Sequence, residues 1–130
     1  LLHEADQHQR MLLHPGDQLL VTEPANLQPP PGSTRIAGFS RPLKGWHEDV
    51  TIHQFTDTTP QAVIDHYQQQ AHEAGFELAT GLQDPDKARA VWSRTVATAS
   101  EKNTEMLSVR ARRDTAGMTR VVVWLRRPAR

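Results

Sequence analysis

The sequence predicts an α+β fold, in which an antiparallel sheet of about five to six strands carries one main helix on one face. The expected order is β-β-α-β-β-β-β, after a short N-terminal helix or arm. Residues 60–74 hold a helical apolar stripe between two capping signals. The segments after this helix alternate apolar and polar residues and are separated by turn-forming residues. A single helix suits an antiparallel sheet because only the covered face then needs to be apolar.

The N-terminal part of the chain differs in composition from the rest. Residues 1–13 carry a weak apolar stripe, and the pair Pro15-Gly16 ends any helix there. The run Pro29-Pro30-Pro31-Gly32 favours a stiff, extended connector. The predicted organisation is therefore an N-terminal arm with a proline-rich linker at residues 1–28 and one α+β domain at residues 29–130. A chain of 130 residues has the usual length of a single domain.

Two strands are expected before the main helix, at Thr34–Phe39 and Asp49–Phe55, with residues 41–46 as a loop or wide hairpin. In the second strand, alternation puts the apolar residues Val50 and Ile52 on one face of the sheet. The polar residues Thr51 and His53 lie on the other face.

The helix at residues 60–74 has the clearest signals. Thr59 suits the N-cap, Pro60 suits the first helical position, and Gly75 suits a left-handed cap at the end. Its apolar stripe consists of Val63, Ile64, Tyr67, Ala71 and Ala74. A third strand starts at once with Phe76, and three more are expected at Arg89–Thr95, Glu105–Arg112 and Thr119–Arg126, with turns at 100–103 and 114–117.

Composition limits the classes of protein and of site. Hydrophobic residues make up 37% and charged residues 23%, which indicates a globular domain. Cysteine is absent, which excludes disulfides, thiolate metal sites and cysteine nucleophiles. No apolar run approaches the length of a membrane span, about 18–20 residues. The start at Leu1 rather than Met is expected for a mature chain from which a signal peptide or upstream anchor has been removed, and equally for a fragment trimmed from a longer chain.

The formal net charge of zero hides a strong asymmetry along the chain. Residues 1–86 contain 4 Lys and Arg against 12 Asp and Glu, a balance of −8, and residues 87–130 contain 11 against 3, a balance of +8. Such a split indicates either a basic binding face or two halves that neutralise each other, within the fold or in a homodimer.

The last strands carry the candidate binding site. Alternation puts Leu107, Val109 and Ala111 with Val121, Val123 and Leu125 on the helix-covered face. The opposite face is expected to carry the candidate binding residues Trp92, Arg94, Arg110, Arg112, Arg120, Trp124 and Arg126. Guanidinium groups bind carboxylate or phosphate in a bidentate manner, and indole rings stack on flat ligands. The structural alternative is that these arginines only protect the strands from aggregation and that the tryptophans pack beneath them.

No catalytic constellation stands out, so no catalytic residue, metal site or cofactor is predicted. His66 and His72 are six residues apart on one helix, unlike an i, i+4 ligand pair. Ser40 and Ser93 lack the glycines of a nucleophile elbow, and no phosphate-binding glycine loop is present. The enzymatic alternative is a small hydrolase or metal-binding protein that uses His47, His53 or His66 with a nearby carboxylate.

One stretch resembles a known group of proteins. The proline run at 29–31, Thr59-Pro60-x-x-Val63-x-x-x-Tyr67 and Gly75-Phe76 are similar to small exported bacterial proteins and lipoproteins of unassigned function. The resemblance covers about residues 29–78 and supplies no catalytic residue. It implies a location in the periplasm or cell envelope and an accessory or binding role. The chain shows no lipobox cysteine.

The functional hypothesis is therefore a non-enzymatic binding or accessory module of the bacterial envelope. A protein partner, or a second copy of the chain, is the first expectation for its ligand, and an anionic polymer is the second. Nucleic acid ranks lower because the chain is not basic overall. A purely structural domain is the remaining alternative.

Overall fold

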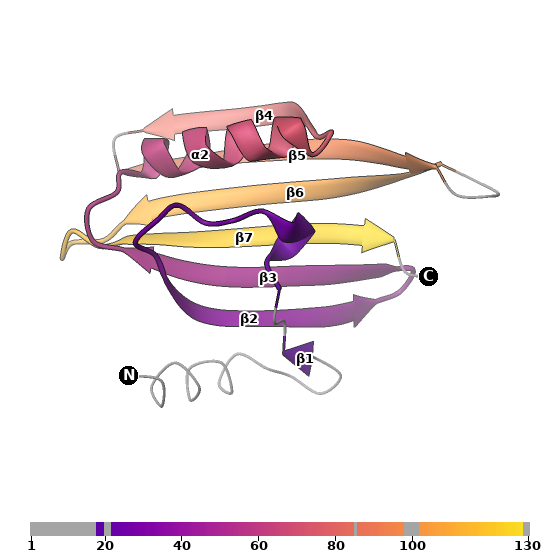
Figure 1. Cartoon of the computed structure of the whole chain (residues 1–130), viewed down its shortest axis with the longest axis horizontal. Helices are drawn as coiled ribbons and strands as arrows, with labels where there is room; N and C mark the ends of the chain where they lie inside the picture. Colours follow the sequence, from indigo (N-terminus) through magenta and orange to yellow (C-terminus); the bar gives the residue numbers. More distant parts are fainter. Residues whose placement is uncertain (1–17, 20–21, 85, 98–101, 129–130) are drawn as a thin grey trace.

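The computed structural model describes residues 18–19, 22–84, 86–97 and 102–128. They form one antiparallel sheet of seven strands with a single α-helix on one face, which confirms the predicted α+β class (Figure 1). The strand order is β1-β2-β3-β7-β6-β5-β4. The expected helix at residues 1–13 lies outside the described residues.

The elements in chain order are β1 (Gln18–Leu19), the 3₁₀ turn η1 (Pro24–Asn26), β2 (Thr34–Leu43), β3 (Trp46–Phe55), α2 (Pro60–Glu73), β4 (Glu77–Asp84), β5 (Lys87–Ala97), β6 (Lys102–Arg113) and β7 (Thr119–Pro128). The short strand β1 pairs with β2 at one edge of the sheet, and β4 forms the other edge.

The connection between β2 and β3 is tighter than the loop expected at residues 41–46. The strands pair as far as Leu43 and Trp46, which leaves Lys44 and Gly45 as a two-residue turn. Gly45 has a φ of 79°, a conformation that costs glycine little, so the chain can reverse within this turn.

Helix α2 has the predicted caps and stripe. The Thr59 hydroxyl accepts a hydrogen bond from the backbone N–H of Ala62 at 3.2 Å, and Gly75 ends the helix with a φ of 90°. Val63, Tyr67 and Ala71 are fully buried on the sheet side. The predicted apolar face of β6 and β7 is also confirmed, because its members lie in the same core cluster: Leu107, Val109, Ala111, Val121, Val123 and Leu125.

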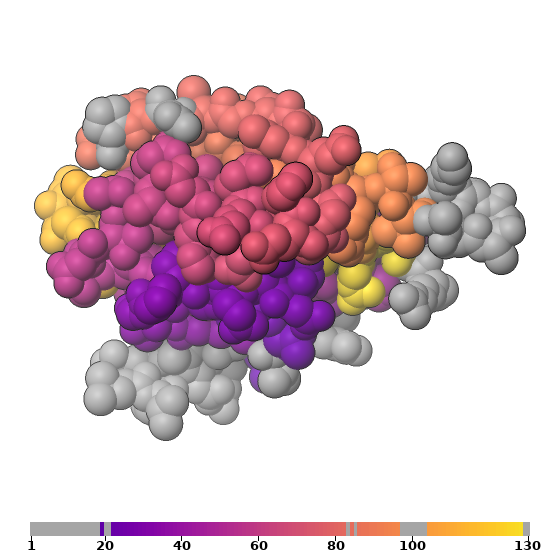
Figure 2. Space-filling model, turned by 45° about the horizontal axis from the view of Figure 1, so that its top comes forward, coloured from indigo at the N-terminus to yellow at the C-terminus, as the bar shows by residue number. Residues whose placement is uncertain are grey.

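A strap formed by residues 23–28, which includes η1, lies beside α2 on the same face of the sheet (Figures 1 and 2). Leu27 belongs to the core and is only 5% exposed. The backbone of Gln28 is bound to the helix, because its N–H donates to Gln70 Oε1 at 2.8 Å and its carbonyl accepts from Gln70 Nε2 at 2.7 Å. Part of the expected linker is thus packed against the domain.

Strand β3 turns polar side chains toward the core. Thr51 and His53 pair with Val123 and Val121, so they face α2 and the strap, whereas Val50 and Ile52 lie on the opposite face. His53 is 1% exposed, and its Nε2 lies 3.1 Å from Glu23 Oε2 of the strap. The Glu23 carboxylate of the strap therefore supplies a partner for one ring nitrogen of the buried His53.

This polar cluster perturbs two titratable groups. Burial by itself would raise the pKa of Glu23, but the hydrogen bond and charge of His53, together with the charge of Arg35, leave that pKa below its ordinary value of 4.5. Burial, with a smaller contribution from the charge of Glu23, raises the pKa of Tyr67. The Tyr67 hydroxyl is buried and has no hydrogen-bond partner in the part of the chain that the structure describes.

Candidate anion-binding face

The face of the sheet opposite α2, here called the back face, carries most of the predicted binding residues. Arg110 and Arg112 of β6 and Arg120 of β7 are exposed on it, as the sequence predicts. Strand β5 adds Lys87 and Arg89, which pair with Arg112 and Arg110 and therefore share their face. The cation cluster is defined as Lys87, Arg89, Arg110, Arg112 and Arg120.

The positions within the cluster follow from the register. Arg89 lies directly opposite Arg110, and Arg112 lies between Lys87 and Arg120 on the two neighbouring strands. Neighbouring strands are about 4.8 Å apart, and residues two apart on one strand are separated by about 6.8 Å. The alternation of β5, β6 and β7 thus collects five cations in a compact array.

Within the described residues, no member of the cluster forms an ion pair. Four carboxylates of the structure pair with other arginines: Glu23 with Arg35, Glu48 with Arg41, Asp49 with Arg127, and Glu105 with Arg94. Of these four pairs, only Asp49 with Arg127 joins the acidic first half of the chain to the basic second half, and none of the four involves the cluster.

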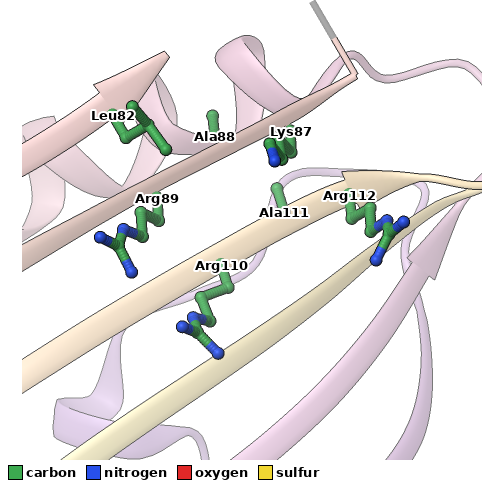
Figure 3. A pocket seen from close by; sticks show the side chains of 7 residues that line it. All are labelled: Leu82, Lys87, Ala88, Arg89, Arg110, Ala111 and Arg112. Carbon is green, nitrogen blue, oxygen red and sulfur yellow. The ribbon is translucent and has the colours of Figure 1, made fainter. Parts of the chain in front are cut away.

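The cluster borders a hollow in the surface with a volume of about 300 Å³. Its lining consists of Leu82, Lys87, Ala88, Arg89, Arg110, Ala111 and Arg112 (Figure 3). Four of these seven residues are cations, and Figure 3 shows Arg89 and Arg110 extending to the same side from neighbouring strands. The back face is therefore not flat at this end of the sheet.

The two remaining predicted residues of the back face, Trp124 and Arg126, lie farther along β7 than Arg120. Trp124 is half-buried between Val50 and Ser108, its partners on the neighbouring strands. Arg126 places its guanidinium carbon 4.4 Å from the centre of the Trp46 ring, a cation–π contact. An apolar, aromatic strip thus adjoins the cation cluster.

Trp92 and Arg94 are not where the sequence analysis placed them. Trp92 pairs with Leu107 on the helix-covered face, is fully buried, and donates its indole N–H to Gln68 Oε1 at 2.6 Å. The side chains of β5 therefore face the opposite sides of the sheet from those expected. The alternation of Lys87-Ala88-Arg89-Ala90 is the sequence signal that could have indicated the correct faces, because the small alanines fit beneath the helix.

Arg94 has a structural role on the same covered face. Its Nε and Nη2 donate to Glu105 Oε1 at 2.8 and 2.6 Å, and its Nη1 donates to the carbonyl of Ala74 at 2.8 Å. Its guanidinium also lies 4.3 Å from the centre of the Phe76 ring. Arg94 thus ties the C-terminal end of α2 to β5 and β6.

The described residues contain no group of three or more His, Asp or Glu side chains placed to hold a metal ion. His66 lies within 2.8 Å of the Gln28 carbonyl, and His53 contacts Glu23 in the core. In the same part of the chain, no helix has the length and hydropathy needed to cross a membrane.

Comparison of the chain with protein-family models, with curated proteins and with solved structures finds no match. The functional argument therefore depends on the geometry of the back face.

Proposed function

We propose that this protein is a non-enzymatic binding module whose back face contacts an anionic macromolecule. The observation that supports the proposal best is the cation cluster, which gathers five exposed positive charges, none of them in an ion pair among the described residues. Guanidinium groups in such an array bind carboxylate and phosphate groups by paired hydrogen bonds.

The aromatic strip next to the cluster extends the contact surface. Trp124 and the stacked pair of Trp46 and Arg126 combine an apolar surface with a positive edge. Interfaces favour tryptophan and arginine for this combination. An acidic protein surface or an anionic polymer would meet both parts of the back face.

The cellular setting belongs to the same proposal. The resemblance of residues 29–78 to small exported bacterial proteins favours an accessory role in the periplasm or cell envelope. A chain of zero net charge has weak long-range steering, so recognition would depend on the local charge of the back face.

Retention on immobilised polyanions tests the proposal. We expect the protein to be retained on heparin or poly-glutamate at 50 mM NaCl and to be released as the salt concentration rises, because salt screens exposed charges over about 10 Å at 0.1 M. Arg110→Glu should abolish retention. The matched control is Lys44→Glu, which makes the same change in net charge at the turn between β2 and β3.

Equal elution of the two variants would contradict the proposal, because it would show that retention follows net charge and not the back face. Circular dichroism of both variants checks the fold. Arg110 and Lys44 are both exposed, so both reversals should leave the spectrum unchanged.

A further inference from the structure

The hollow at the end of the back face combines a limited volume with a high density of charge. Its volume of about 300 Å³ is at the lower end of the range for small-ligand sites, about 300–1,000 Å³. Its four cations come from only two strands, β5 and β6, and Leu82 adds an apolar wall from β4.

The arrangement of these cations is unfavourable for the unliganded fold. Arg89 faces Arg110 and Lys87 faces Arg112 as direct cross-strand partners. Like charges directly opposite each other on a sheet destabilise it. Within the described residues none of the four forms an ion pair, although Asp84 of β4 lies opposite Lys87. A bound anion would relieve the repulsion that remains, above all between Arg89 and Arg110. Departures from a local rule of this kind are expected at functional sites.

We propose that the hollow binds a diphosphate group, carried by a linear polyphosphate or by a larger molecule. Two linked phosphates bring about three to four negative charges and several acceptor oxygens into a small volume, which matches four cations. Side chains on one face of an extended acidic peptide repeat only every 6.8 Å or so, with one charge each. Such a peptide would leave part of the positive charge unmatched.

The lining also restricts what the diphosphate is attached to. Among the described residues, the hollow is lined by four cations, two alanines and one leucine, with no aromatic side chain. A nucleobase therefore has no ring to stack on here. Recognition is expected to depend on the phosphates alone.

This inference rests on the proposed function, since the hollow is part of the back face, and it can fail separately. Isothermal titration calorimetry with inorganic pyrophosphate and long-chain polyphosphate at low salt provides the test. Arg89→Gln and Arg110→Gln should each weaken pyrophosphate binding by at least about tenfold, the effect of losing one charged, bidentate contact. Arg120→Gln is the comparison variant within the cation cluster, because Arg120 is exposed on the same face but does not line the hollow, and it should weaken binding less than either lining variant. Lys44→Gln, at the turn between β2 and β3, is the control away from the back face and should leave binding unchanged.

The outcomes separate the two proposals. Equal losses in Arg89→Gln, Arg110→Gln and Arg120→Gln would overturn the hollow as a site and leave the back face as a diffuse polyanion surface. Binding of poly-glutamate that is as tight as that of polyphosphate, and is lost in Arg89→Gln, would overturn the diphosphate assignment. Undetectable pyrophosphate binding together with undiminished retention on polyanions would also overturn the diphosphate assignment. A nucleoside diphosphate that binds no tighter than pyrophosphate would support recognition of the phosphates alone.

Discussion

Replacement of Trp92 by Phe distinguishes a core role for this residue from a role in binding. Trp92 is fully buried on the helix-covered face, and its indole N–H donates to Gln68. The change removes about three buried heavy atoms, each carbon contributing roughly 0.8 kcal/mol by transfer, and leaves a small cavity. Loss of the hydrogen bond adds about 1 kcal/mol. The free energy of unfolding should therefore fall by about 2–3 kcal/mol.

Urea unfolding followed by circular dichroism measures this loss. Trp124→Phe is the matched control, because Trp124 is half-buried on the back face, and it should lower the free energy of unfolding by less than about 1 kcal/mol. Retention of the Trp92→Phe variant on polyanions should stay unchanged. A variant with wild-type stability and reduced retention would refute this reasoning and return Trp92 to the binding surface.

Three further changes test the contacts that hold the elements together. Glu23→Gln should lower the free energy of unfolding at pH 7 by about 2 kcal/mol, because it removes the charged partner of the buried His53. Since the pKa of Glu23 is depressed, the contribution of its carboxylate to the free energy of unfolding is fully present above pH 4.5 and is lost as the pH falls through the folded-state pKa. The variant should lack this loss when its stability is measured at decreasing pH. Arg94→Ala should destabilise the domain by about 2 kcal/mol, measured by thermal unfolding, since it leaves Glu105 without its partner and the end of α2 without its donor. Thr59→Ala should cost about 1 kcal/mol through the lost N-cap, and an unchanged melting temperature would contradict the cap.

The predicted fold class depends on signals that are local in the sequence. The caps of α2 lie within a few residues of its ends, and its stripe follows from the helical period. The faces of β6 were predictable for the same reason, because its apolar residues alternate with Ser108, Arg110 and Arg112. In β7 the central residues 121–125 are all apolar, and the phase is marked by Arg120 and Arg126 at either side of them. Arg110, Arg112 and Arg120 are thus where the sequence placed them.

Long-range contacts decided the remainder of the candidate site. Trp92 and Arg94 alone did not indicate which face of β5 is covered, and the register of β5 against β6 turned both inward while adding Lys87 and Arg89 to the back face. Likewise, nothing near His53 in sequence indicates that Glu23, thirty residues earlier, supplies its partner. The sequence by itself determined α2 and the strands from β2 to β7, because capping and periodicity act over a few residues, whereas β1 and η1 were not predicted. The tertiary structure decided which side chains meet, because strand register and the burial of charge depend on residues far apart in the chain.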